Sequence, residues 1–135
     1  MLPRGLRNNN PGNINFANQT GAVLEPVSPT VPHPRFAKFD TLDDGIRALI
    51  FQLRLYFDRG INTVTEIISK WAPPTENFTQ NYIASVATSM DVSPSAVLDP
   101  TNEVLAGLVM AISCMENGHD LPFNKDHVLS LMSVA

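Results

Sequence analysis

Apolar residues recur at helical spacing along most of the chain beyond residue 41. The first set falls at i, i+3, i+4, i+7 and i+11, which places its members on one helix face: Ile46, Leu49, Ile50, Leu53 and Phe57. Thr41 with Asp44 resembles a capping box ahead of them, with aspartate where glutamate is usual. Arg59-Gly60 ends the pattern. The chain therefore predicts a long amphipathic helix between Thr41 and Arg59.

Shorter helical patterns follow this first helix. Thr63 and Glu66 form a second capping box ahead of further apolar residues at helical spacing. Pro73-Pro74 stops this second helix, because proline lacks the N–H that the next hydrogen bond needs. We expect Asn77 to cap a third helix, and residues from about 125 to 134 to form a last amphipathic one.

The most apolar helix of the chain comes before that last one. We expect it to open at Asp99 or Thr101, and its apolar residues point in nearly every direction: Val104, Leu105, Leu108, Val109, Ile112 and Met115. A helix of this kind is buried on most sides, so we expect it at the centre of the fold. It should end at Glu116-Asn117-Gly118, where asparagine or glycine suits the left-handed cap position.

The first 40 residues show no helical period. Residues 4–16 are rich in asparagine and glycine, which favour turns and hydrogen bonds from side chains to the backbone. Residues 17–35 hold four prolines and predict an extended loop or a stretched hairpin connection. The alternation of residues 35–39 indicates a short strand.

Length and composition indicate one globular domain. The chain has 135 residues, of which 44% are hydrophobic and 16% are charged. We predict a mainly α domain over residues 1–135. Residues 1–40 would form an asparagine-rich turn, a proline-rich loop and the short strands of a small β-hairpin, and residues 41–135 would form a helical body. The single cysteine, Cys114, excludes a disulfide framework and a cysteine-rich zinc site.

Charge and hydropathy argue against several classes of function. The formal net charge is -4 and the basic residues are scattered, so we expect no nucleic-acid partner. No apolar run approaches the ~20 residues of a membrane span. The histidines share no ligand spacing, so we expect neither a metal site nor a cofactor. The N-terminus lacks the apolar stretch of a signal peptide, so we expect cytoplasmic synthesis and delivery by another carrier.

Glu116 occupies the most unusual position of any charged residue. It lies in the last turn of the apolar helix, where the helix dipole disfavours a carboxylate by about 0.3–1 kcal/mol. The apolar stretch before it would exclude water and favour the protonated acid. A protonated carboxylic acid is what general acid catalysis requires. The alternative is that Glu116 is exposed and has no role in catalysis.

Two other carboxylates are weaker candidates. Glu76 follows Pro73-Pro74 and precedes a helix, where the dipole stabilises a negative charge without any catalytic role. Glu25 lies in the proline-rich loop, which we expect to lie over a cleft.

Amide and aromatic side chains suggest where a sugar would bind. Asn8, Asn9, Asn10 and Asn13 offer amides that suit the hydroxyl and acetamido groups of a glycan. They suit equally well a turn that its own side chains hold together. Tyr82 falls on the apolar face of its helix and would either pack in the core or contact the ligand. Its hydroxyl needs a partner if it is buried.

The string RGLRNNNPGNI resembles the RGxRNNNPGNI opening of a group of phage and prophage proteins that are described as virion or structural proteins. Their later landmarks also occur here in order: FDTLDDGIRAL, IISKWAPPTENFTQNYIASV and AISCMENG. The resemblance covers about residues 4–118. It implies a phage or prophage protein whose partners include other virion proteins.

A second resemblance is to flagellar and autolysin-type N-acetylglucosaminidases, which have a lysozyme-like fold. These enzymes carry an asparagine-rich turn, then a strand and helix similar to AKFDTLDDGIRALIFQL, then an aromatic stretch with a tyrosine. Their catalytic glutamate lies on a helix before the turn, whereas the similar LAGLVMAISCMENG stands here near the end of the chain. The resemblance therefore implies a circularly permuted lysozyme-like domain.

This resemblance implies cleavage of peptidoglycan glycan strands by a muramidase, a glucosaminidase or a lytic transglycosylase. Glu116 would be the general acid, with Glu76 or a carboxylate of residues 17–35 as a second group. The asparagine-rich turn, Tyr82 and Asn117 would line the sugar cleft. A virion or a prophage-derived device would carry the protein to the periplasm or cell wall. The alternative is a non-catalytic phage structural or glycan-binding module.

Overall fold

The computed structural model describes residues 2–72 and 78–132. Within this part the chain is mainly helical with one small antiparallel hairpin, which confirms the predicted class. The elements in chain order are α1 (Arg4–Arg7), β1 (Ala22–Leu24), β2 (Ala37–Phe39), α2 (Leu42–Asp58), α3 (Val64–Trp71), α4 (Thr79–Met90), α5 (Asn102–Asn117) and α6 (Lys125–Met132).

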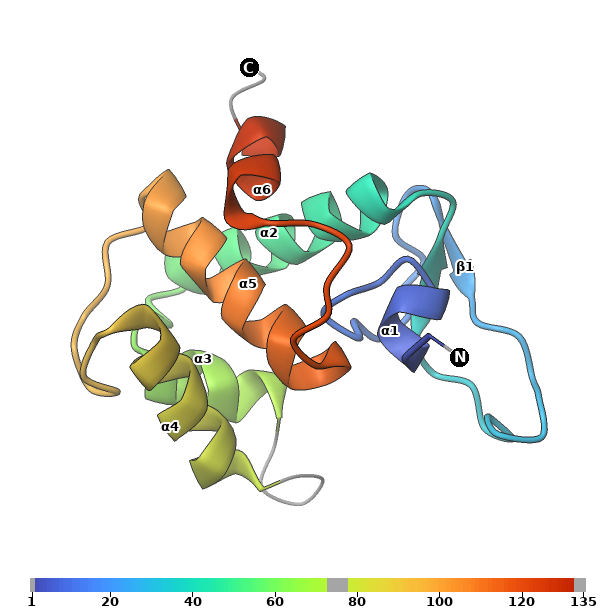
Figure 1. The fold of residues 1–135 in the computed structure, drawn as a ribbon, viewed down its shortest axis with the longest axis horizontal. Helices are drawn as coiled ribbons and strands as arrows, with labels where there is room; N and C mark the ends of the chain where they lie inside the picture. Colours follow the sequence, from blue (N-terminus) through green and yellow to red (C-terminus); the bar gives the residue numbers. More distant parts are fainter. Residues whose placement is uncertain (1, 73–77, 133–135) are drawn as a thin grey trace.

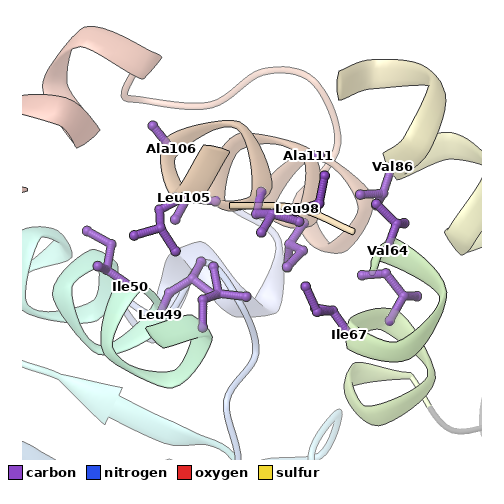
Figure 2. Packing of buried hydrophobic residues seen from close by; sticks show 14 of the residues in the cluster. Leu49, Ile50, Val64, Ile67, Val86, Leu98, Leu105, Ala106 and Ala111 are labelled. Carbon is purple, nitrogen blue, oxygen red and sulfur yellow. The ribbon is translucent and has the colours of Figure 1, made fainter. Parts of the chain in front are cut away.

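Helix α5 lies at the centre of the fold, as its apolar sequence predicts (Figure 1). It packs against α2, α4 and α6, and its C-terminal end reaches α1. Leu105, Leu108 and Ile112 of α5 have at most 1% of their surface exposed. Figure 2 shows Leu49 of α2 and Ile67 of α3 in the cluster of buried apolar side chains that these helices form with α5. The buried apolar face of each helix is therefore what holds the domain together.

Threonine hydroxyls cap three of the helices. The backbone N–H of Asp44 donates to Thr41 at 3.1 Å, and the backbone N–H of Glu66 donates to Thr63 at 3.1 Å. The N-terminus of α5 is capped in the same way by Thr101, which settles the choice between Asp99 and Thr101. Each cap satisfies a backbone donor that the helix itself leaves unpaired.

Two predicted local features differ from the structure. Helix α4 begins at Thr79 with Phe78 at its N-cap, and Asn77, the predicted cap, lies outside the described residues. Phe78 offers no side-chain cap, and the hydroxyl of Thr79 donates to the Ala72 carbonyl at 2.6 Å. The head of the chain is also more regular than predicted, since residues 4–7 form the short helix α1.

The hairpin pairs the proline-rich segment with the strand before α2. Ala22 is the register partner of Phe39, and Leu24 is the partner of Ala37. Strand β2 is the inner one, with Ala37 and Phe39 buried, while most of β1 is exposed. An isolated bridge between Asn15 and Phe36 adds residues 14–16 along the opposite edge of the β2 segment, where the N–H of Ala37 donates to the Ile14 carbonyl at 2.9 Å. The segment predicted as an extended loop or a stretched hairpin connection thus contains strand β1 and most of the connection that leads to β2.

The asparagine-rich turn (residues 8–13) is enclosed at the junction of α1, the hairpin, α2 and α5. Asn10 is completely buried, and its amide nitrogen donates to the carbonyl oxygens of Ile14 at 3.0 Å and Ala37 at 2.8 Å. Asn9 and Asn13 adopt left-handed backbone conformations with φ of 51° and 50°. Asparagine tolerates this conformation better than most residues, which explains its repetition in the turn.

Gly45 sets how closely α2 approaches this turn. A Cβ atom at Gly45 would overlap the Asn9 carbonyl oxygen and lie 3.2 Å from Cδ of Pro11. Both neighbours belong to a buried turn that cannot easily move aside. Gly107, in the middle of α5, is different, because the nearest atom to a Cβ there would be Cε of Met90 at an ordinary 3.6 Å.

We therefore expect Gly45→Ala to lower the free energy of unfolding by about 2 kcal/mol or more, through overpacking of the turn. Gly107→Ala is the matched control. It adds the same methyl group to a helix interior with room for it, and should raise stability by up to about 1 kcal/mol. Chemical denaturation of both variants tests this. Equal stability of Gly45→Ala and wild type would show that α2 does not press on the turn.

Candidate functional site

Three distant segments of the chain meet at the carboxylate of Glu116. Glu116 lies half-buried in the last turn of α5. The amide nitrogen of Asn13, 103 positions earlier, donates to Glu116 Oε1 at 2.6 Å. The hydroxyl of Tyr82, on α4 and 34 positions earlier, donates to Glu116 Oε2 at 2.9 Å. The structure thus brings together three residues that the sequence indicated independently as candidate site residues.

Tyr82 is held as a hydrogen-bond donor. Its side chain is buried on α4, with 6% of its surface exposed. Burial raises the pKa of the Tyr82 hydroxyl far above its usual range, and the charge of Glu116 and the hydrogen bond between them raise it further. The phenol therefore stays protonated at any physiological pH and fixes the orientation of the Glu116 carboxylate.

Asn117, the neighbour of Glu116, ties the end of α5 to the asparagine-rich turn. Its amide nitrogen donates to the Pro11 carbonyl at 2.8 Å and to the Ser113 carbonyl at 3.0 Å. The side chain is buried, so it fixes the position of the turn instead of facing open solvent. Gly118 follows with φ of 88°, a conformation that favours glycine, and ends the helix at this point.

Gly5 of α1 leaves the space in which these amides meet. A Cβ atom there would lie 2.9 Å from Oδ1 of Asn13 and closer still to Oδ1 of Asn117. Neither of these two buried oxygens has a hydrogen-bond partner among the described residues. A side chain at this position would displace the two residues that contact or adjoin Glu116.

The other asparagines of the turn act within it. Asn8 donates from its amide nitrogen to Glu25 at 3.0 Å, and Asn9 donates to the carbonyl oxygens of Phe39 and Asp40 at 3.0 and 3.2 Å. Asn10 is buried and bonded as described above. Their contact with a sugar stays a prediction, and their observed bonds assign them to the construction of the turn.

Neither candidate for a second carboxylate is placed beside Glu116 by the structure. Glu76 lies outside the described residues. Glu25 is buried against α1, where Arg4 Nε donates to it at 3.0 Å and the backbone N–H groups of Arg35 and Phe36 donate at 3.1 and 2.8 Å. Arg4 also lies over the ring of Phe36, 4.2 Å from its centroid. Glu25 therefore anchors the hairpin to α1.

A hollow of about 250 Å³ begins beside Asn13. Its walls include Gln52 and Tyr56 of α2 and Lys70 and Trp71 of α3. The indole N–H of Trp71 donates to the Gly12 carbonyl at 3.0 Å, and its ring meets Tyr56 edge-on with centroids 6.1 Å apart. Gln52, Tyr56 and Lys70 carry no signal in the sequence, because only the folded arrangement of α2 and α3 brings them to one hollow.

Metal and membrane chemistry find no support in the part of the chain that the structure describes. No group of three or more His, Cys, Asp or Glu side chains there could hold a metal ion. No helix within residues 2–72 and 78–132 has the length and apolar character needed to cross a membrane.

Comparison with known proteins adds one informative relative. No family model matches the chain. Protein P5 of Pseudoalteromonas phage PM2 is 37% identical to it over 126 residues, which is 93% of this chain and 77% of that protein. The match therefore includes both the asparagine-rich turn and the helix that carries Glu116 in a single alignment of nearly the whole chain.

The anchor at Glu25 predicts how stability depends on pH. Burial of Glu25 opposes its ionisation, but the Arg4 guanidinium and the donated hydrogen bonds outweigh this and lower the pKa from 4.5 to about 2. The depressed value means that the folded state holds the proton less tightly than the unfolded state. The stabilisation is therefore complete above pH 4.5 and lost as the pH falls towards 2.

The expected loss across this window is about 3 kcal/mol from Glu25 alone. Urea denaturation between pH 6 and pH 2 measures it, with Glu25→Gln as the control because glutamine does not titrate. We expect the pH dependence of the variant to be shallower than that of wild type by about this amount. Parallel curves would contradict the role of Glu25.

Proposed function

This chain belongs to the family of protein P5 of Pseudoalteromonas phage PM2, and from that premise we propose that it is a phage enzyme that cleaves the glycan strands of peptidoglycan. The observation that carries the proposal is the arrangement at Glu116. A half-buried carboxyl group at a helix end is held by Asn13 and Tyr82. One positioned acid of this kind is the central requirement for breaking a glycosidic bond.

The chemistry follows from the two hydrogen bonds. Asn13 and Tyr82 each occupy one lone pair on a different oxygen of Glu116, and a second lone pair on each oxygen stays available. Protonated Glu116 gives its proton to the glycosidic oxygen while the bond from that oxygen to the anomeric carbon breaks. In the transglycosylase route the Glu116 carboxylate then takes the proton of the attacking sugar hydroxyl. In the inverting hydrolase route a second carboxylate takes the proton of the attacking water.

The attacking group decides the class of enzyme. Attack by a hydroxyl of the same sugar needs only Glu116 and leaves an anhydro end, which is the reaction of a lytic transglycosylase. Attack by water in an inverting hydrolase needs a second carboxylate about 6.5–9.5 Å away. Because Glu25 is engaged with Arg4 and Asn8, Glu76 is the remaining candidate of the two for that role.

The relation to lysozyme-like glucosaminidases draws support from the position of the turn. A circular permutation requires the end of the glutamate helix to lie next to the asparagine-rich turn in the folded protein, although the helix comes after the turn in sequence. Asn117 donates to the carbonyl of Pro11, 106 positions away, so the end of α5 and the turn are neighbours. Domains tolerate this kind of rearrangement when their ends lie at the surface.

A non-catalytic glycan-binding or structural module is the second candidate. The same two hydrogen bonds support it, because they join α5 to α4 and to the turn whether or not a proton is transferred. In either case we propose that a phage particle carries the protein to the cell wall, and that other virion proteins are its partners there. Membership of a phage protein family supports this delivery.

Glu116→Gln separates the two candidates. Glutamine cannot donate a proton as an acid, so we expect the rate of peptidoglycan cleavage to fall by 10²-fold or more. The network itself can survive, because the glutamine oxygen can accept from Asn13 while its amide donates to the Tyr82 hydroxyl. We therefore expect the free energy of unfolding to change by less than about 1 kcal/mol.

Glu103→Gln is the matched control, because it removes a carboxylate from the first turn of the same helix. Glu103 is exposed and pairs with Lys125 at 2.7 Å, a surface contact of small energetic value. This variant should keep its activity. Undiminished cleavage by Glu116→Gln would sink the assignment of Glu116, and a loss of stability above ~2 kcal/mol would favour the structural module.

A further inference from the structure

The hollow beside Asn13 continues along α2 into a larger one. The second hollow has a volume of about 730 Å³ and is bounded by α2, β2 and the segment before the hairpin. Four residues line both hollows: Ile14, Ala17, Gln19 and Gln52. The two are therefore parts of one groove, named here the α2 groove, which starts next to a direct partner of Glu116 and extends away from it.

The α2 groove carries positive charge on an acidic protein. Arg47, Arg54 and Lys70 line it, against the single carboxylate of Asp44, whereas the chain as a whole has a net charge of -4. Asp44 and Arg47 approach only to 3.5 Å, and both are well exposed, so their pairing neutralises little. The groove would therefore attract an anionic ligand.

Its near end offers polar groups that are free for a ligand. The Tyr56 hydroxyl and the Gln52 side-chain amide make no hydrogen bond among the described residues, and neither does Lys70. Tyr56 and Trp71 add aromatic surface next to them. Amides, a hydroxyl and aromatic edges in one hollow suit a sugar bearing hydroxyl and acetamido groups.

Its far end combines charge with an apolar wall. Arg47, Phe51 and Arg54 follow one another at i, i+4 and i+7 and so share one face of α2. Phe51 is 63% exposed, which is unusual for an aromatic side chain on a helix that contributes to the core. This arrangement suits a short acidic peptide. The two guanidinium groups would bind its carboxylates, and the ring between them would contact its apolar side chains.

We propose that the α2 groove binds the peptide-bearing form of the glycan, with a sugar in the near hollow against Tyr56 and Trp71 and the acidic stem peptide across Arg47 and Arg54. This inference rests on the proposed function, since it names the substrate form that reaches Glu116. The volume of the far end falls within the range of sites that hold a molecule of this size. The groove thus recognises the stem peptide, while Glu116 acts on the sugar chain.

Binding of Glu116→Gln to purified sacculi tests the proposal without cleavage. Cosedimentation is measured with intact sacculi and with sacculi whose peptides an amidase has removed. Arg47→Gln with Arg54→Gln in this background should weaken binding to intact sacculi about 10-fold and leave binding to stripped glycan unchanged. Arg7→Gln with Lys125→Gln removes the same charge from residues outside the groove and should have no effect on either.

Three results would overturn the proposal. The first is equal binding of intact sacculi by the groove variant and its parent. The second is an equal loss of binding to stripped glycan, which would mean that the arginines do not recognise the peptide. The third is no binding of either preparation by the parent, which would leave an acidic partner protein as the occupant. Selective loss on intact sacculi together with full cleavage by Glu116→Gln would refute only the proposed catalysis.

Discussion

The attachment of the asparagine-rich turn to the end of α5 is the constraint on which the rest of the site depends. Asn117 donates to Pro11 and Asn13 donates to Glu116, so the first and last thirds of the chain are fastened at one point. Gly5 and Gly45 allow this by leaving no side chain between the turn and its neighbours. The turn is thus a buried structural element that positions the Glu116 carboxylate.

Most asparagines of the site take part in its construction, and one also lines the α2 groove. Four of them donate their side-chain N–H groups to the turn and to the segments packed around it: Asn8, Asn9, Asn10 and Asn117. Asn13 has both roles, because it contacts Glu116 and lines the α2 groove. A hydrogen-bond network of this kind holds the Glu116 carboxylate in one geometry, which is what the proposed general acid catalysis requires.

Local signals in the sequence were sufficient to predict most of the fold. Capping threonines and helical periodicity located α2, α3 and α5, and the apolar character of α5 placed it at the centre. Glu116 was identifiable because its carboxylate opposes the helix dipole. The start of α4 could not be predicted from a capping residue, since Phe78 stands at its N-cap and makes no side-chain cap hydrogen bond. Nor could the α2 groove be predicted, because α2, α3 and the N-terminal segment form it only when packed.

Mass spectrometry of the soluble fragments that wild-type protein releases from purified peptidoglycan tests the central claim most directly. The account predicts fragments with newly formed saccharide ends. Anhydro ends would identify a lytic transglycosylase in which Glu116 acts alone, and reducing ends would identify a hydrolase. The absence of such fragments, from folded protein that sediments with the wall, would contradict the claim that this phage protein cleaves glycan strands.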